Sequence, residues 1–182
     1  MGHKAVTRLT REGISAGHTD LMPRLLLVHH SPTTSVGALT DAVVAGAHDD
    51  DVQGVDVAVR PALEATAQDV LAADGLLLGT PANFGYMSGA LKHFFDSLFL
   101  DIGGSLSDDG SAAGGGSEGR KPFGLYVHGR YDTTGAVRSV LAITGALPWR
   151  QAAQTLSVLG DVTRADEEAA YELGGTLAAL LS

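Results

Sequence analysis

The sequence contains no cysteine among its 182 residues. This absence excludes disulfides, cysteine-ligated zinc, iron–sulfur clusters and catalysis by a thiol. No redox chemistry can therefore come from protein sulfur. A lack of cysteine also suits a reducing cytoplasm, which is where we expect the protein to reside.

Positive charge is scarce, since 12 Lys and Arg stand against 21 Asp and Glu and give a formal net charge of −9. Nucleic acids and anionic membranes are bound through Lys and Arg, so both are excluded as expected partners. No apolar run approaches the roughly twenty residues that span a bilayer. Residues 1–23 lack the uninterrupted apolar core of a signal peptide, and we expect them to form a disordered leader.

Apolar runs alternate with helical patterns through the rest of the chain. With 182 residues, of which 45% are hydrophobic, the sequence can bury the core of one domain, which we expect over 24–182. This alternation predicts an α/β fold with a parallel sheet. The expected strands cover 25–29, 55–59, 75–79, 123–128 and 155–159. The expected helices cover 36–47, 66–73, 88–99, 134–146 and 163–181.

Local signals mark some element boundaries. Thr66 with Asp69, and Thr163 with Asp166, have the spacing of a capping box. The segment 103–119 is almost entirely Gly, Ser and acidic residues, which predicts a flexible loop. Because it follows a helix and precedes a strand, it leaves from the edge opposite the ligand edge and is a linker rather than a lid, unless a partner subunit brings it to a neighbouring site.

A ligand site is predicted where the strand at 75–79 ends. The loop Thr80–Gly89 joins the carboxyl end of that buried strand to the start of an amphipathic helix. In open α/β sheets, ligands bind at this edge, because loops converge there and helix N-termini present free N–H groups.

A second polar loop follows the first strand. Ser31, Thr33, Thr34 and Ser35 supply four hydroxyls at a strand-to-helix turn. Hydroxyls and free N–H groups at a helix N-terminus can hold an anion without lysine, which suits a phosphomonoester. The alternative is that these residues only cap the helix.

Three segments carry a resemblance to a known family: HHSPTTSVGALT, GTPANFGYMSGALKHFFD and LYVHGRYDTTGAVRSV. The chain resembles the flavodoxin-like superfamily, in the branch of NAD(P)H-dependent FMN reductases and tryptophan-repressor-binding-type NAD(P)H:quinone oxidoreductases. The resemblance implies a three-layer α-β-α sandwich with a five-stranded parallel sheet in the order 2-1-3-4-5. It also implies FMN as cofactor and NAD(P)H as electron donor.

The resemblance assigns roles to the three loops. In the first, the four hydroxyls and the amides leading to Val36 would hold the FMN phosphate, although Thr34, Ser35 and Val36 stand where many relatives have glycine, a small polar residue and threonine. The second loop would flank the isoalloxazine ring through Pro81, Ala82, Asn83, Phe84, Gly85, Tyr86 and Met87. Phe84 could instead be a buried anchor.

The third loop would contact the cofactor through His128, Gly129, Arg130 and Tyr131 and shape substrate entry. The His128 side chain could protonate a reduced quinone or only hydrogen-bond a carbonyl. Arg130 could steady an NADPH phosphate or form a surface salt bridge. No metal site is predicted, because the adjacent His29 and His30 face opposite sides of a strand.

The resemblance therefore implies an FMN-dependent NAD(P)H oxidoreductase that reduces a quinone or a similar small acceptor, and we expect a homodimer or homotetramer. Two alternatives stay open: a flavodoxin-type one-electron carrier that docks with protein partners, and a flavin-free binding module on the same fold. No Gly-x-Ser-x-Gly, Gly-x-Gly-x-x-Gly or His-Glu-x-x-His motif points to another chemistry.

Overall fold

The computed structural model describes residues 22–104 and 120–182. The predicted leader at 1–23 and the glycine-rich segment 103–119 lie almost wholly outside the described residues.

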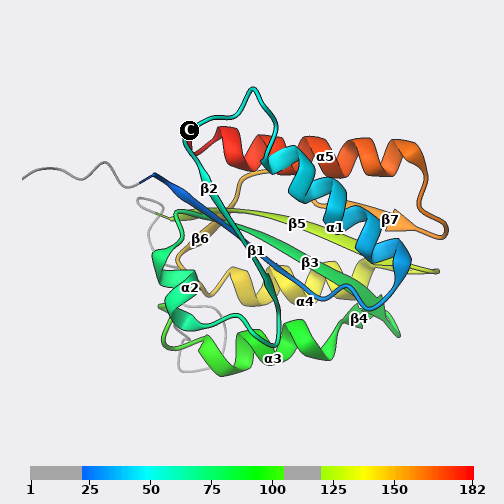
Figure 1. Ribbon diagram of the computed structural model, residues 1–182. Helices are drawn as coiled ribbons and strands as arrows, with labels where there is room; N and C mark the ends of the chain where they lie inside the picture. Colours follow the sequence, from blue (N-terminus) through cyan, green and yellow to red (C-terminus); the bar gives the residue numbers. More distant parts are fainter. Residues whose placement is uncertain (1–21, 105–119) are drawn as a thin grey trace, which may run out of the picture.

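The structure confirms the predicted alternation of strands and helices (Figure 1). The strands are β1 (Arg24–His29), β2 (Asp56–Pro61), β3 (Gly75–Asn83), β4 (Tyr86–Met87), β5 (Lys121–Gly129), β6 (Trp149–Gln151) and β7 (Leu156–Leu159). The helices are α1 (Thr34–Ala47), α2 (Ala67–Ala72), α3 (Gly89–Leu98), α4 (Thr134–Thr144) and α5 (Arg164–Ala179). Strands β4 and β6 were not predicted.

The sheet order confirms the predicted topology. Strands run β2-β1-β3-β5, and both β6 and β7 pair with β5 along its outer edge. Strand β6 pairs with Lys121–Phe123 and β7 with Tyr126–Gly129, so together they form the fifth strand in two pieces. All of these pairs are parallel, whereas β4 folds back antiparallel onto β3.

Helices cover both faces of the sheet and make the three predicted layers. Helices α1 and α5 lie on one face, and α2, α3 and α4 on the other (Figure 1). The central run Leu76–Leu78 has no exposed surface, because alternate side chains enter the core on each face. Both predicted capping boxes form at the starts of α2 and α5. Within the two described ranges, no helix is long and apolar enough to cross a membrane.

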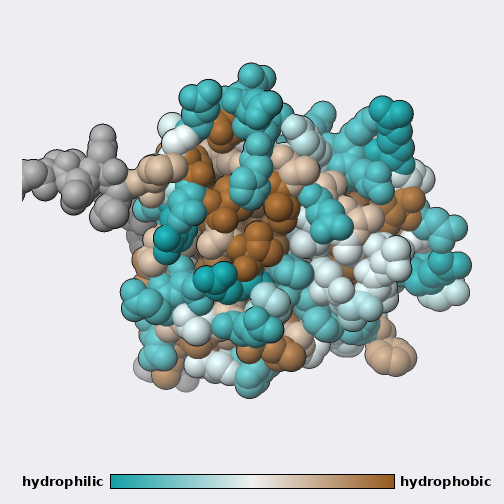
Figure 2. All heavy atoms as spheres, viewed as in Figure 1, coloured by the Kyte–Doolittle hydropathy of each residue, from teal (hydrophilic) through white to brown (hydrophobic). Residues whose placement is uncertain are grey.

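The hydropathy surface shows an apolar patch over the β2 edge of the sheet, bordered by polar residues (Figure 2). Strand β2 ends the sheet on this side, and its residues are only half buried up to Val59. The charged Arg60 and the imino acid Pro61 close the strand, and both features oppose the pairing of a further strand.

Glycines fix helix α1 against helix α5. A Cβ atom at Gly46 would overlap the backbone carbonyl of Tyr171, and one at Gly174 would overlap the carbonyl of Val43. The two backbones are therefore in direct contact, and this contact holds the C-terminal end of α1 against α5.

We expect Gly174→Ala to lower the free energy of unfolding by about 1 to 3 kcal/mol, the usual cost of overpacking a close contact. Gly37→Ala, on α1, is the matched control, because a Cβ there meets nothing within 4 Å. It should raise the free energy by roughly 0.5 to 1 kcal/mol through helix propensity. Urea denaturation measures both changes, and equal effects of the two variants would contradict the close contact.

Candidate functional site

The strand register brings the three predicted loops to one edge of the sheet. His29, at the end of β1, pairs with Gly79 of β3, and Pro81 of β3 pairs with His128 of β5. The N–H of His30 donates to the carbonyl of Gly79 at 3.0 Å, which ties the first loop to the central strand. A ligand at this edge can therefore touch all three loops.

In the first loop, Thr33 is the N-cap of α1. Its hydroxyl accepts from the Val36 N–H at 3.4 Å, and its carbonyl accepts from the Gly37 N–H at 2.9 Å. The N–H groups of Thr34 and Ser35 precede the first helical hydrogen bond and have no acceptor inside the helix. Their hydroxyls make no hydrogen bond with another described residue. Thr34 and Ser35 thus offer the donors of the predicted phosphate cradle, while Thr33 serves the helix.

Ser31 points into a hydrogen-bonded network rather than standing alone. Its Oγ lies 2.7 Å from Thr40 Oγ1 and 2.9 Å from His29 Nδ1. Thr40 Oγ1 in turn lies 2.7 Å from the Tyr126 hydroxyl and donates to the Val36 carbonyl at 2.9 Å. Neither Thr40 nor Tyr126 was among the residues predicted for the site.

One sequence signal could have found the buried tyrosine. Tyr126 and Gly79 are register partners in adjacent central strands, and a Cβ at Gly79 would overlap the tyrosine ring. When a glycine and a tyrosine occur on adjacent apolar strands, the tyrosine ring can lie directly over the backbone of the glycine, because no side chain is in the way. Burial raises the pKa of the Tyr126 phenol above its ordinary range, so the hydroxyl keeps its proton.

His29, the last residue of β1, and His30, which follows the strand, differ in their surroundings. Burial lowers the pKa of His29, the neighbouring His30 lowers it further, and Asp41 partly opposes both effects. The Nδ1 atom of His30 is buried and has no hydrogen-bond partner among the described residues. Such an atom needs a partner from a ligand or from water, and it lies beside the first loop.

The second loop is a tight hairpin. Asn83 pairs with Tyr86 across a turn formed by Phe84 and Gly85, whose φ angles are 51° and 81°. Two positive φ values in a two-residue loop define a type I′ turn, which favours Asn-Gly over Phe-Gly. The Phe84 side chain is fully exposed, so the alternative of a buried anchor is wrong.

Thr80 fastens the base of this hairpin. Its buried hydroxyl accepts from the Ser88 N–H at 3.0 Å and donates to the Pro81 carbonyl at 2.9 Å. The Ser88 hydroxyl then caps α3 by accepting from the Leu91 N–H at 3.1 Å. Pro81 and Met87 are buried below the turn, and the exposed aromatic rings of this loop are those of Phe84 and Tyr86.

A cavity of about 400 Å³ lies between the hairpin and the third loop. Its lining residues are Ala82, Phe84, Gly85, Arg130, Tyr131 and Asp132. The Phe84 and Tyr131 rings are both exposed there. Five of the predicted site residues are therefore brought together around one cavity, within the size range of small-molecule sites.

Two predicted residues of the third loop already have partners. Arg130 Nη1 pairs with Asp161 Oδ1 at 2.8 Å, which is the salt-bridge alternative. His128 Nε2 donates to the carbonyl of Gly160 at 2.8 Å, and this ring does not line the cavity. Backbone Gly129 is packed against Ala82 and Thr133 with no room for a side chain. The catalytic role of His128 stays a prediction.

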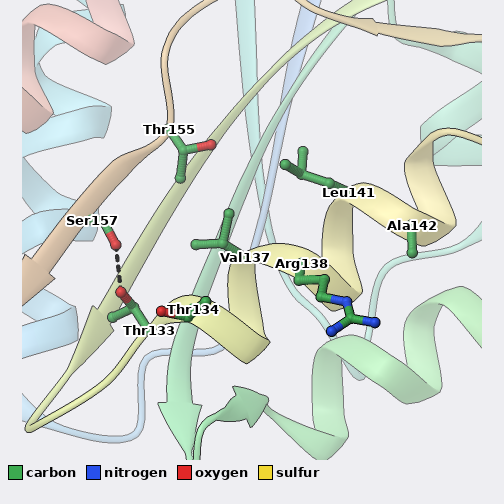
Figure 3. A pocket seen from close by; sticks show the side chains of 8 residues that line it. All are labelled: Thr133, Thr134, Val137, Arg138, Leu141, Ala142, Thr155 and Ser157. Atoms are coloured by element: carbon green, nitrogen blue, oxygen red, sulfur yellow. Dashed lines mark hydrogen bonds between the residues drawn. The ribbon is translucent and has the colours of Figure 1, made fainter.

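A second cavity, of about 740 Å³, lies between α4 and β7 (Figure 3). Val137 and Leu141 form part of its apolar wall, and the Thr133 hydroxyl points to Ser157 Oγ at 2.6 Å. No predicted site residue lines it. In the described part of the chain, no group of three or more His, Asp or Glu side chains could hold a metal ion.

A family model described as "NADPH-dependent FMN reductase" matches residues 29–155. The chain belongs to this family. The matched segment contains all three loops, and the membership supports FMN as the cofactor and NAD(P)H as the electron donor.

Curated relatives of this chain include a flavodoxin from Aquifex aeolicus, which is 34% identical to it. The matched region covers 53% of this chain and 55% of that relative. An NAD(P)H dehydrogenase (quinone) from Acidithiobacillus ferrooxidans is 30% identical over 51% and 53% of the two chains. The chain thus spans about half the length of these relatives.

Solved structures show the same fold at low identity. A flavodoxin from the domain Archaea gives a TM-score of 0.67 at 14% identity, covering 87% of this chain and 98% of that one. The WrbA-like flavodoxin from Agrobacterium tumefaciens gives 0.60 at 16% identity, covering 87% and 97%. These likenesses establish the flavodoxin-like fold.

The arrangement fits FMN on its own chemistry. The first loop offers uncharged donors, and the adjacent His30 has a buried ring nitrogen with no partner among the described residues, which a ligand or water would satisfy. The cavity with its exposed rings lies across the end of β3 from that loop, where a planar ring can be flanked. In this chain of the FMN reductase family, Thr34 and Ser35 would hold the phosphate, and Phe84 and Tyr131 would flank the ring.

Because Phe84 has a positive φ, replacing it should change the stability of the protein and its affinity for FMN in opposite directions. We expect Phe84→Asn to raise the free energy of unfolding by about 1 kcal/mol, because asparagine adopts this conformation at lower cost and no buried contact is lost. The same variant should bind FMN more weakly. Urea denaturation and FMN titration measure the two effects. Lower stability of the variant would contradict the proposed strain.

The lowered pKa of His29 makes stability depend on pH. The unfolded chain binds the proton more tightly, so the free energy of unfolding should fall as pH drops below about 6.5 toward the lower folded pKa. His29→Asn keeps a donor near Nδ1 and should flatten this slope. Replacing the exposed His93 by Asn is the control. An unchanged slope in His29→Asn, measured by urea denaturation at several pH values, would refute the assignment.

Proposed function

We propose that the protein is an FMN-dependent NAD(P)H oxidoreductase that passes reducing equivalents to a quinone or a similar small acceptor. Membership of the NADPH-dependent FMN reductase family supports this proposal. The relative from Acidithiobacillus ferrooxidans, an NAD(P)H dehydrogenase (quinone), supports the quinone as acceptor.

One observation carries the proposal: an uncharged loop of donors and a cavity lined by aromatic rings lie at the same edge of the sheet, on either side of the end of β3. The loop suits a phosphate dianion, and the cavity suits a flat ring. No Ser, Thr, Lys or His side chain is among the residues that line the cavity, which suits a site where a bound cofactor carries the chemistry.

FMN, when bound, supplies hydride transfer between the nicotinamide and the acceptor. The protein's own residues would bind the FMN and orient it. The N–H and hydroxyl groups of Thr34 and Ser35 fix the phosphate end, and the exposed Phe84 and Tyr131 rings exclude water from the ring end. Arg130, which lines the cavity, is placed to meet an anionic group of an incoming substrate if its exposed salt bridge to Asp161 opens.

His128 has a positioning role in this proposal. Because its Nε2 donates to the Gly160 carbonyl, the ring joins the end of β5 to the turn after β7. Proton delivery by His128 to a reduced quinone remains part of the prediction, and its Nδ1 atom is the one left for that purpose.

A one-electron carrier is the second candidate, and the 34% identity to the flavodoxin from Aquifex aeolicus favours it. The net charge of −9 also suits docking to a basic protein partner. Steady-state oxidation of NADH or NADPH, measured at 340 nm with FMN-loaded protein and benzoquinone, separates the two. Turnover supports the reductase, and tight FMN binding without turnover supports the carrier.

The phosphate assignment is tested by titration with FMN and with riboflavin, which lacks the phosphate, following the quenching of flavin fluorescence. We expect the wild-type protein to bind FMN far more tightly than riboflavin. The double variant Thr34→Ala/Ser35→Ala should lose about 1 to 3 kcal/mol of FMN binding, because hydroxyls donate strong hydrogen bonds to a dianion. Thr176→Ala, an exposed threonine on α5, is the control.

Equal affinity for FMN and riboflavin, or an unchanged FMN affinity in the double variant, would refute the phosphate site. Cytoplasmic location and assembly as a homodimer or homotetramer belong to the same proposal. Light scattering on the FMN-loaded protein gives the assembly directly.

A further inference from the structure

Three buried or half-buried hydroxyls form a continuous line from the middle of the sheet to the first loop. The Tyr126 hydroxyl and Ser31 Oγ each lie 2.7 Å from Thr40 Oγ1, which also contacts the Val36 carbonyl at 2.9 Å. Thr40 and Tyr126 are buried, so water does not compete for these hydrogen bonds. The proton positions along this line follow from counting donors and acceptors.

Thr40 has one proton and two lone pairs for three neighbours. When it donates to the Val36 carbonyl, it must accept from both Ser31 and Tyr126. The Ser31 proton is then used inside the protein, and His29 Nδ1, at 2.9 Å, must donate to Ser31 Oγ. In this arrangement Ser31 has no proton to offer to an anion.

A second arrangement satisfies the same distances. The Thr40 hydroxyl turns its proton from Val36 to Ser31, and Ser31 turns its own proton outward to the loop. The Val36 carbonyl keeps a partner, because the helix supplies it with the Thr40 N–H four residues later. Tyr126 donates to Thr40 in both arrangements. All three hydroxyls then point the same way, and each bond polarises the next.

We propose that Tyr126 and Thr40 are positioning residues that turn Ser31 into a hydrogen-bond donor when an anion binds at the first loop. The inference rests on the proposed function in naming the FMN phosphate as that anion. The buried phenol supplies the first proton of the line, and its ring is held across Gly79, where no side chain fits. In this proposal the effect of both residues on the anion passes through the Ser31 hydroxyl.

This dependence defines the experiment. Thr40→Val and Tyr126→Phe each remove one hydroxyl from the line with little change of shape. Each should lower the affinity for FMN about three- to tenfold and leave the affinity for riboflavin unchanged. Thr40→Ser should bind FMN as the wild type does. Thr144→Val is the matched control, because this buried α4 hydroxyl donates to a carbonyl four residues back and lies at the far end of its helix.

The same two substitutions are repeated in a Ser31→Ala background. If they act through Ser31, their effect on FMN affinity disappears there. A merely structural role predicts that the losses persist in this background and extend to riboflavin. Either of those results, or unchanged FMN affinity in Thr40→Val and Tyr126→Phe, would overturn the inference. Thermal unfolding checks that each variant is folded.

A second probe separates this inference from the proposed function. Inorganic phosphate is titrated while the amide signals of Thr34 and Ser35 are followed by NMR. If the wild type rejects FMN but binds phosphate with the same dependence on Thr40 and Tyr126, the flavin function fails and the relay stands. If the wild type binds neither FMN nor phosphate, both the flavin function and the relay fail. If it binds FMN and the variants match it, the function stands and the relay fails.

Discussion

The burial of a parallel sheet on both faces is the constraint from which the rest of this structure follows. Side chains of Leu25–Val28 and Leu76–Leu78 have no exposed surface, so these strands can carry almost no polar chemistry along their length. Polar side chains are displaced to the carboxyl edge, where the chain leaves the sheet. The candidate site lies there because it is the first place where hydroxyls, imidazoles and charged groups can be hydrated or bound.

Hydrophobic periodicity was enough to predict an α/β fold with a parallel sheet, whereas the order of the strands came from the family resemblance. Runs such as Leu76–Leu78 are too apolar for any position except a central strand, and the threonine–aspartate pairs at Thr66 and Thr163 fix two helix starts. The split of the fifth strand could not be predicted, because Trp149–Gln151 is a three-residue segment with two exposed residues. Only pairing with β5 makes it a strand. The β4 hairpin was missed because Phe84-Gly85 lacks the Asn-Gly signal of its turn type.

That the three loops meet at one edge of the sheet was predictable from the sequence, whereas the direction of their side chains was not. The sequence placed Ser31, Thr33, Thr34 and Ser35 in one loop, but four neighbouring hydroxyls look alike until the helix start is known. Once Thr33 is the cap and Ser31 contacts Thr40, only the hydroxyls of Thr34 and Ser35 have no partner among the described residues. Thr40 and Tyr126 are separated by 86 positions in the sequence, and they meet only because the Tyr126 side chain points to the face of the sheet that α1 covers. Spacing within a sequence carries no information about such a contact.

The glycine contact between α1 and α5 affects how fast a ligand could be bound. Because Gly46 and Gly174 bring the two backbones together, α1 cannot tilt or slide without moving the C-terminal helix as well. The first turn of α1, with its exposed N–H groups, is held by the opposite end of the same rigid helix. The entropy of ordering the loop is therefore lost during folding and not on association. An incoming anion would then meet backbone N–H groups that are already in place, and only hydroxyl rotations would remain to be made on association.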